Sequence, residues 1–333
     1  MSENKVTINY KGQTLVTKHH KPMSDSMFLE LKEQYYAKPQ MKHVRNEVRD
    51  IFLRGNVTMR KINDYYFKDL MAKVRLYHSY WCIEDVFNHK PLLESFYSKT
   101  FSNLDVYPAE TPMIKKIETA FRIGGKGVAN KPTNFRLDQT IEIVKKYNLN
   151  DNYYDPSCGW GVRLVGSLAT GVNYFGTDPN YELVERLKTV ADLFKEVDLF
   201  APECDIRAQG SERFVPEWEN KIGLVFTSPP YFFLEDYRIG EQSTKNFSDY
   251  QEWLEKYMLK TFENAYRYMI SGAYILININ DYDKYTLEND TQTMLKRAGF
   301  EYVATETFDN ITRINSNGIE NENNENIFVF KKP

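Results

Sequence analysis

A short segment with two consecutive prolines is the most informative part of this sequence. Residues 227–231 read TSPPY and directly follow an apolar run, IGLVF. Proline fixes its own backbone and cannot continue a β-ladder. Pro229 and Pro230 are therefore predicted to hold Ser228 in a rigid turn at the end of a buried strand. Tyr231 adds a flat ring that can stack on a planar substrate, so the segment predicts a site for a planar group.

A glycine-containing loop precedes this segment by about seventy positions, between a predicted strand and a predicted helix. Residues 155–161 read DPSCGWG. Gly159 and Gly161 allow a ligand to approach the backbone, and the helix that follows offers free N–H groups. Ser157 belongs to the same loop, and the carboxylate of Asp155 would suit a cationic amino group. Such a loop is also a common tight turn, so the motifs that follow it are needed to distinguish a ligand-binding loop from a structural turn.

Acidic residues follow at the next two predicted strands. Asp178 lies 23 positions after Asp155, a spacing at which an acidic side chain can bind ribose hydroxyls in a doubly wound sheet. Asp205 lies in the third predicted strand and could accept a hydrogen bond from an adenine amino group. Aspartates often cap helices and turns instead. The glycine loop favours binding for Asp178, whereas both interpretations stay open for Asp205.

The order of these motifs resembles that of the class I S-adenosylmethionine-dependent methyltransferases, and more narrowly the DNA amino-methyltransferases of bacteria and phages. The resemblance covers about residues 125–333 and implies a Rossmann-like, seven-stranded, mostly parallel sheet. It implies that the glycine loop holds the methionine part of the cofactor, Asp178 the ribose and Asp205 the adenine. It also implies a segment that closes over the methionine end, for which Asn134 and Phe135 are candidates.

The same resemblance implies catalytic roles for Ser228, Pro229, Pro230 and Tyr231. The Ser228 hydroxyl and the Pro229 carbonyl would accept hydrogen bonds from the exocyclic amine of a DNA base, so that geometry supplies much of the rate. A base in a duplex would have to be flipped out, at a cost of about a few kcal/mol. Serine in the first position favours cytosine N4, and adenine N6 stays open.

Two departures from the family pattern leave other functions open. Only about twenty residues separate Asp205 from Thr227, which is short for a target-recognition segment. Recognition would then fall to the N-terminal third and to the loops 232–247 and 309–326. The glycine loop also lacks the Phe-x-Gly-x-Gly order common in the family. The alternatives are an RNA methyltransferase acting on guanine N2, a protein amide methyltransferase and a catalytically idle binding module.

The elements that must position these motifs are indicated by alternating strand and helix signals after Phe135. Strands are predicted at 152–155, 173–177, 203–206, 222–226, 273–279, 301–308 and 327–330, and helices at 136–147, 161–170, 180–197, 248–269 and 287–298. Residues 1–25 are predicted to be extended or partly disordered, 25–100 helical and 124–127 a basic loop. We therefore expect a mainly helical N-terminal region, 1–124, with a possible role in target recognition, and a methyltransferase domain, 125–333.

Charge and composition narrow the class of protein. Residues 1–136 hold 23 basic and 14 acidic side chains, although the whole chain has a net charge of −3. This distribution suits a polyanion such as DNA or RNA, and equally a solvated lysine-rich surface. All five histidines lie within the first 89 residues, which removes His-dependent nucleophiles and His-ligated metals from the rest of the chain. With no apolar run of about 18 residues and no signal sequence, we expect a cytoplasmic, metal-free protein of a bacterial or phage-infected cell.

Overall fold

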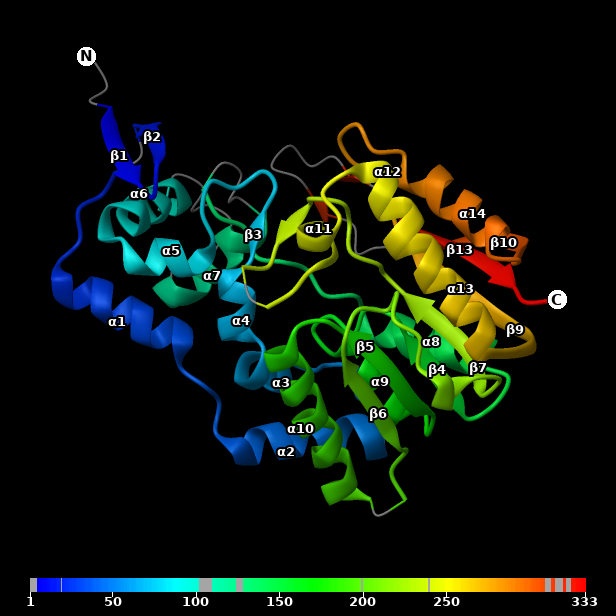
Figure 1. The fold of residues 1–333 in the computed structure, drawn as a ribbon. Helices are drawn as coiled ribbons and strands as arrows, with labels where there is room; N and C mark the ends of the chain where they lie inside the picture. Colours follow the sequence, from blue (N-terminus) through cyan, green and yellow to red (C-terminus); the bar gives the residue numbers. More distant parts are fainter. Residues whose placement is uncertain are drawn as a thin grey trace. The chain divides into compact units, whose positions relative to one another are not determined.

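The structure is a computed structural model, and it describes residues 5–18, 20–101, 110–123, 128–198, 200–238, 240–308, 313–314, 320–321 and 325–333. The chain forms two compact units, and Figure 1 labels their elements. Unit 1 comprises Met1–Gln40, Asp64–Thr133 and Phe233–Ile239; unit 2 comprises Met41–Asn63, Asn134–Phe232 and Gly240–Pro333. The predicted basic loop 124–127 and most of the predicted loop 309–326 lie outside the described residues.

A seven-stranded sheet forms the centre of unit 2, in the order β10-β13-β9-β7-β4-β5-β6. β13 runs antiparallel to β9 and β10, and the other neighbours pair in parallel. The strands are β4 (Asn152–Asp155), β5 (Asn173–Asp178), β6 (Cys204–Ala208), β7 (Ile222–Thr227), β9 (Met269–Asn278), β10 (Glu301–Phe308) and β13 (Glu325–Lys331). The predicted Rossmann-like, mostly parallel sheet is confirmed. β6 continues to Ala208, two residues beyond its predicted end.

Helices cover both faces of this sheet. Tyr153 and Tyr154 are neighbours on β4 and therefore point to opposite faces, and both are fully buried. One group of helices contains α2 (Met41–Arg54), α8 (Leu137–Tyr147), α9 (Val162–Ala169) and α10 (Tyr181–Val197), which pack against one another. The other contains α12 (Tyr250–Trp253), a π-helical turn (Leu254–Met258), α13 (Leu259–Tyr268) and α14 (Leu287–Arg297).

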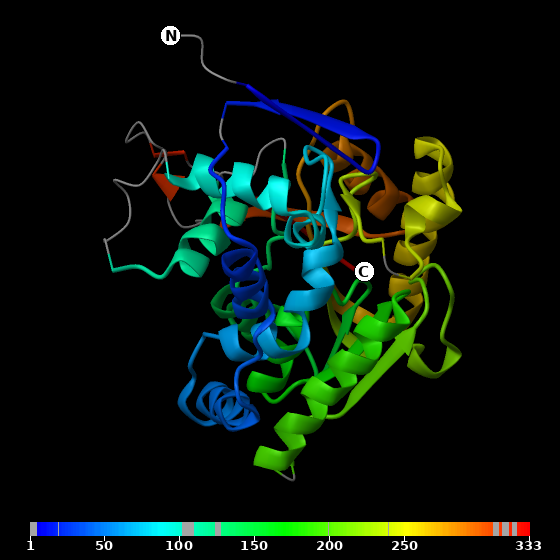
Figure 2. The same cartoon turned by 90° about the vertical axis from the view of Figure 1, so that its left-hand side faces the viewer.

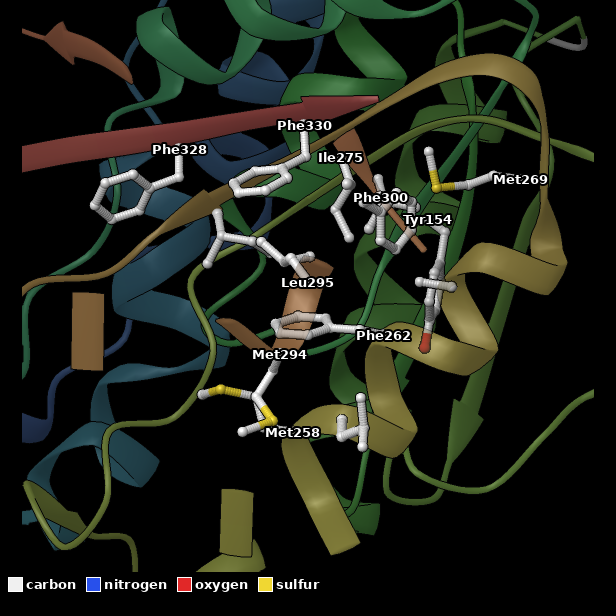
Figure 3. Close-up of a cluster of buried hydrophobic side chains, with 14 of the residues drawn as sticks. Tyr154, Met258, Phe262, Met269, Ile275, Met294, Leu295, Phe300, Phe328 and Phe330 are labelled. Atoms are coloured by element: carbon white, nitrogen blue, oxygen red, sulfur yellow. The ribbon is translucent and has the colours of Figure 1, made fainter. Parts of the chain in front are cut away.

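The second group of helices meets the sheet through a large apolar cluster (Figure 3). Phe262 and Leu295 come from the helices, and Ile275, Phe328 and Phe330 from the strands; each is at most 3% exposed. Burying a side chain of this size stabilises a fold by about 1.5–3 kcal/mol. The layer is thus a rigid support for the loops at the carboxyl ends of the strands.

Unit 1 is built mainly of helices around its own apolar core. Its elements are β1 (Val6–Tyr10), β2 (Gln13–Thr17), α1 (Asp25–Tyr36), α4 (Lys68–Lys73), β3 (Arg75–Leu76), α5 (Ile83–Asn88), α6 (Lys90–Phe101), α7 (Met113–Ile123) and β8 (Glu235–Asp236); β1, β2 and α1 are the dark blue elements in Figure 2. β1 and β2 form a hairpin where the sequence predicted an extended segment. Lys11 and Gly12 both have positive φ, as a two-residue hairpin turn requires. Helix α3 (Arg60–Tyr66) spans the junction of the two units.

The observed division of the chain differs from the boundary expected at residue 124. Segment 41–63 belongs to unit 2 because α2 packs against α10. The ring centroids of Phe52 and Phe194 are 6.1 Å apart, and Arg45 Nε lies 2.8 Å from Glu196 Oε2. Conversely, Phe233–Ile239 belongs to unit 1, since β8 pairs with β3. Segments 41–63 and 233–239 thus each belong to a different unit from the residues next to them in the sequence.

Candidate active site

The carboxyl ends of three parallel strands bring the predicted motifs together in unit 2. Asp155, the last residue of β4, pairs with Gly176 of β5, and Tyr154 pairs with Val225 of β7. The glycine loop, Asp178 and the TSPPY segment therefore leave the sheet at the same edge. Ligands of open parallel sheets bind outside this edge, so the geometry concentrates the candidate residues where a site is expected.

Asp155 is fully buried at this edge of the sheet, and its carboxylate is not exposed to solvent. Its Oδ1 accepts hydrogen bonds from the Ser157 N–H (3.2 Å) and the Thr227 hydroxyl (2.9 Å). Its Oδ2 accepts from Arg163 Nε (2.8 Å) and the Tyr174 hydroxyl (2.9 Å). Four protein donors thus occupy the Asp155 carboxylate, for which the sequence analysis expected a cationic amino group as the partner. The hydrogen bond from Thr227 also links the TSPPY segment to the glycine loop.

Arg163 supplies the positive charge that balances this buried carboxylate. Its side chain is 8% exposed and also donates to the carbonyl of Ser157. Burial lowers the pKa of the guanidinium, but the adjacent Asp155 carboxylate more than offsets this, so the pKa is raised and Arg163 stays charged. A buried ion pair with its hydrogen bonds satisfied fixes local geometry, because removal of either partner leaves an unpaired charge.

The glycine loop has the open backbone that the sequence predicted. Gly159 and Gly161 have φ of +52° and +78°, a region that disfavours side chains. An added Cβ on Gly159 would meet its nearest atoms at 3.7 and 3.8 Å, so the residue faces uncrowded space. The hydroxyl of Tyr257, from the π-helical turn, hydrogen bonds to the side chains of Ser157 and Ser211. This contact links the glycine loop to the π-helical turn.

Asp178 is half-buried at the end of β5. Its carboxylate accepts hydrogen bonds from the backbone N–H groups of Asn180, at 3.0 Å, and of Gly159. Burial dominates over these contacts and raises the pKa of Asp178 to about 7. The residue therefore changes charge near neutral pH. It keeps some solvent exposure, and the contact with Gly159 places it directly beside the glycine loop.

In the structure Asp205 lies within β6 rather than at its end. β6 ends at Ala208, which pairs with Asp178, whereas Asp205 pairs with Phe175 three residues earlier. Its carboxylate accepts from Trp218 Nε1 at 2.8 Å and forms an ion pair with Arg207 at 2.6 Å. Asp205 thus stabilises the body of the sheet. The first residue after the strand end is Gln209, which is half-buried and donates from Nε2 to the Arg213 carbonyl at 2.9 Å.

The TSPPY segment is fixed at both ends. Thr227 is bonded to Asp155, and the hydroxyl of Tyr231 accepts a hydrogen bond from the Asn280 N–H, which follows β9, at 2.8 Å. The ring of Tyr231 contacts that of Tyr282 at 6.2 Å. Pro229 is buried, whereas Ser228, Pro230 and Tyr231 keep part of their surface exposed. The segment therefore presents Ser228 and Tyr231 from a backbone that cannot shift freely.

Asn134 and Phe135, the two candidates for the segment that closes over the methionine end of the cofactor, also lie close to this edge. The ring of Phe135 packs on Phe226 of β7 at 5.2 Å, two residues before Ser228. Asn134 donates from Nδ2 to the side chain of Asn63 at 3.1 Å. Its Oδ1 is shielded from solvent and has no hydrogen-bond partner within the described part of the chain. A buried acceptor without a donor is costly, which favours a ligand donor at this position.

Three residues of this edge were not found by sequence reasoning. Arg163 had a usable signal, because a charged residue inside the apolar helix sequence VRLVGSLA needs a buried partner. Gln209 could be found only by knowing where β6 ends. Tyr257 had no sequence signal, since its position depends on a π-helical turn within an otherwise regular helix.

The residues at this edge fit a nucleoside that carries an amino-acid tail. The Asp178 carboxylate can accept from ribose hydroxyls, Gly159 leaves room for a close approach to the backbone, and the free Oδ1 of Asn134 can accept from an ammonium group. Over the described ranges, no group of three or more His, Cys, Asp or Glu side chains is arranged to hold a metal ion. Nor does any helix in those ranges have the length and apolarity needed to cross a membrane.

Comparison with known proteins gives matches at the level of structure. No protein-family model matches the sequence, and no curated protein matches it. A SAM-dependent methyltransferase from Methanosarcina mazei is similar over 57% of this chain and 96% of its own, with 14% identity and a TM-score of 0.39. Magnesium protoporphyrin IX methyltransferase from Synechocystis, solved with bound SAM, is similar over 59% and 78%, with 11% identity and a TM-score of 0.39. A protein from Thermus thermophilus, provisionally assigned as a DNA modification methylase, is similar over 34% and 48%, with 21% identity and a TM-score of 0.26.

Proposed function

We propose that this chain transfers a methyl group from S-adenosylmethionine to an exocyclic amine of a DNA base, with cytosine N4 as the acceptor. One observation carries the proposal: the hydrogen bond between Thr227 and Asp155 joins the TSPPY segment to the glycine loop at the carboxyl edge of the sheet. The loop and Asp178 supply a nucleoside-binding edge, and Ser228 to Tyr231 supply an adjacent rigid turn for a planar amine. Adenine N6 is the alternative acceptor.

The cofactor, when bound, supplies an electrophilic methyl group on a sulfonium. Ser228 Oγ and the Pro229 carbonyl accept hydrogen bonds from the amine of the base, which turns the nitrogen lone pair toward the methyl carbon. With the cofactor bound, the N–C bond would form as the C–S bond breaks, and the electron pair of the C–S bond would stay on sulfur, so the cofactor would leave as a neutral thioether. The amine then loses one proton to water. Tyr231 stacks on the base and offsets part of the cost of unstacking it.

The choice of a polyanionic substrate is supported by segment 41–63 of unit 2. It contains six basic and two acidic residues, and the six basic side chains are exposed. The acidic ones are used internally: Glu47 accepts from the Ile62 N–H at 2.7 Å, and Asp50 pairs with Arg54 at 2.9 Å. Exposed Lys and Arg side chains attract a phosphate backbone, although Arg54 and Arg45 also form ion pairs, with Asp50 and Glu196. The basic surface thus belongs to the same unit as the proposed catalytic residues.

The test is methyl transfer from tritiated S-adenosylmethionine to duplex DNA, single-stranded DNA, RNA and protein, followed by nucleoside analysis of labelled polymer. We expect N4-methylcytosine in DNA, lost in Ser228→Ala and in Tyr231→Ala. Tyr302→Ala is the matched control, because Tyr302 is 49% exposed on β10 and lies outside the proposed site. Label in RNA or protein alone would refute the DNA substrate, and full activity of both site variants would refute the site.

A further inference from the structure

A stripe of buried polar side chains runs from the π-helical turn into α13. Tyr257, Thr261 and Asn264 are four and three residues apart, so they share one face of the helix. They are 5%, 4% and 8% exposed, and the same helix buries Phe262 and Ala265 in the apolar cluster of unit 2. A buried polar group is costly unless it is hydrogen-bonded, so the partners of the stripe indicate what it holds.

All three side chains contact Ser211, which lies in the loop after β6. Ser211 Oγ forms a hydrogen bond with Thr261 Oγ1 at 2.7 Å, and the Ser211 carbonyl accepts from Asn264 Nδ2 at 3.0 Å. The Tyr257 hydroxyl also bonds to the Ser211 side chain. Ser211 is itself 2% exposed and lies three residues beyond Ala208, the last residue of β6. The loop after β6 is therefore fixed to one helix by three side chains.

The Tyr257 hydroxyl also reaches the glycine loop, where it bonds to the side chain of Ser157. The glycine loop follows β4 and the Ser211 loop follows β6, and in the sheet these two strands lie on either side of β5. β5 ends at Asp178, the candidate ribose-binding residue. One buried hydroxyl thus joins two loops that flank Asp178 at the carboxyl edge of the sheet.

The π-helical turn restricts where this hydroxyl can point. The Leu259 N–H donates to the carbonyl of Leu254, five residues earlier, whereas an α-helix bonds residues four apart. The ring of Tyr257 stacks on that of Trp253, with centroids 5.5 Å apart, and the Trp253 Nε1–H donates to Ser243 Oγ at 3.0 Å. Single π-turns are rare and frequently lie at functional sites. The turn and the stacked rings together hold the Tyr257 hydroxyl between the two serines.

We propose that Tyr257 is a positioning residue that sets the spacing between the glycine loop and the Ser211 loop, so that both ends of the cofactor are held together. This inference rests on the proposed function, which places S-adenosylmethionine at this edge. Without the Tyr257 hydroxyl, Ser211 keeps its bonds to α13. Ser157 keeps its backbone bond to Asp155, but its side chain loses the link to the helix. The glycine loop would then shift relative to a loop that stays in place.

The experiment measures the Kd of S-adenosylhomocysteine and of adenosine by calorimetry in wild type and in Tyr257→Phe. S-adenosylhomocysteine spans both loops of the proposed site, whereas adenosine lacks the part assigned to the glycine loop. We expect the Kd of S-adenosylhomocysteine to rise about tenfold and that of adenosine to rise less than about threefold. Ser157→Ala breaks the same bond from the loop side, so the double variant should bind S-adenosylhomocysteine no more weakly than Tyr257→Phe alone. Ser157→Ala also tests the bond should Tyr257→Phe not fold.

Tyr268→Phe is the matched control. Tyr268 lies on the same helix and is fully buried, and its hydroxyl accepts a hydrogen bond from the Val215 N–H at 2.7 Å. The same atom is removed, but Val215 lies outside both loops, so the Kd of S-adenosylhomocysteine should stay unchanged. Hydrogen exchange of the cofactor-free proteins adds a readout without any ligand. Amides of residues 156–161 should exchange several-fold faster in Tyr257→Phe and at the wild-type rate in Tyr268→Phe.

Each other outcome has a definite meaning. An unchanged Kd of S-adenosylhomocysteine in Tyr257→Phe, or an equal rise for adenosine, would overturn the inference alone. So would equal weakening in Tyr268→Phe, because the effect would then be a general loosening of the helix. A wild-type protein that binds neither S-adenosylmethionine nor S-adenosylhomocysteine would overturn the proposed function and the inference together. Cofactor binding with the expected ratio, but without methylation of DNA, would overturn the proposed DNA substrate and leave the inference standing.

Discussion

Replacement of Asp178 by asparagine gives a quantitative test of the cofactor site. Burial raises the pKa of Asp178 to about 7, so the ionised fraction falls from about nine tenths at pH 8 to about one tenth at pH 6. If the carboxylate must accept hydrogen bonds from ribose hydroxyls, only the ionised protein binds well. The Kd for S-adenosylmethionine should then rise about tenfold between pH 8 and pH 6.

The asparagine variant should remove this pH dependence. Hydrogen bonds to a charged acceptor contribute about 1.5–3 kcal/mol, so Asp178→Asn should weaken binding at pH 8 by about tenfold to a hundredfold and leave a flat profile. Titration calorimetry at pH 6, 7 and 8 measures both effects. A wild-type Kd that does not change with pH would refute the reasoning. So would an equal slope in the variant, which would assign the titration to another group, such as a histidine.

The raised pKa of Asp178 also makes the stability of the cofactor-free protein depend on pH, and this stability falls as the pH rises. The pKa of Asp178 is raised from 3.8, so between about pH 4 and pH 7 the folded chain holds a proton that the unfolded chain has released. Stability contributed by this group therefore falls as pH rises through that window. Without cofactor, Asp178→Asn should melt at a higher temperature than wild type at pH 8, and by a smaller margin at pH 5. A variant that melts at a lower temperature at pH 8 would contradict the shifted pKa.

Three further predictions concern the residues that hold the site. Asp155→Asn leaves the Arg163 charge unpaired and should lower the free energy of unfolding by about 3–5 kcal/mol in urea denaturation, with cofactor binding lost; a loss below 1 kcal/mol would contradict the buried ion pair. Gly166→Ala would place a Cβ 2.4 Å from Thr140 Cγ2 and should destabilise by about 1–3 kcal/mol; Thr140→Ser, which removes that methyl group, should recover only part of the loss, because the Cβ of residue 140 stays 2.9 Å away. Tyr231→Phe keeps the ring but loses the hydrogen bond from a backbone N–H, so kcat should fall by about tenfold, less than in Tyr231→Ala.

The sheet could be predicted from sequence because its strands are short segments between turn or helix signals. Ile222–Thr227 is an almost continuous apolar run, and both it and Asn173–Asp178 differ from their predicted bounds by a single residue. Their parallel order also placed the glycine loop, Asp178 and the TSPPY segment at one edge. Local patterns suffice for these features because a strand buried on both faces leaves a continuous apolar signature.

The roles of the buried acidic residues could not be predicted in the same way. Asp155 and Asp205 both follow apolar residues, but their partners come from elsewhere in the fold: Thr227 for Asp155 and Trp218 for Asp205. The strand end that excludes Asp205 from the edge depends on two additional residues of pairing with β5. Long-range hydrogen bonds and register are tertiary properties, and sequence spacing carries no information about them.

The placement of α2 on α10 also determines when the apolar face of α2 is covered during synthesis. The chain crosses between the two units five times, so neither unit corresponds to a continuous stretch of the gene product. Helix α2 ends at Arg54 and the helix that covers its apolar face begins at Tyr181, about 130 residues later, or about 6–25 s at ribosomal rates of about 5–20 residues per second. During that interval α10 does not cover α2, whose Val44, Val48 and Ile51 are buried in the folded unit, so the apolar face of this helix stays exposed on the nascent chain.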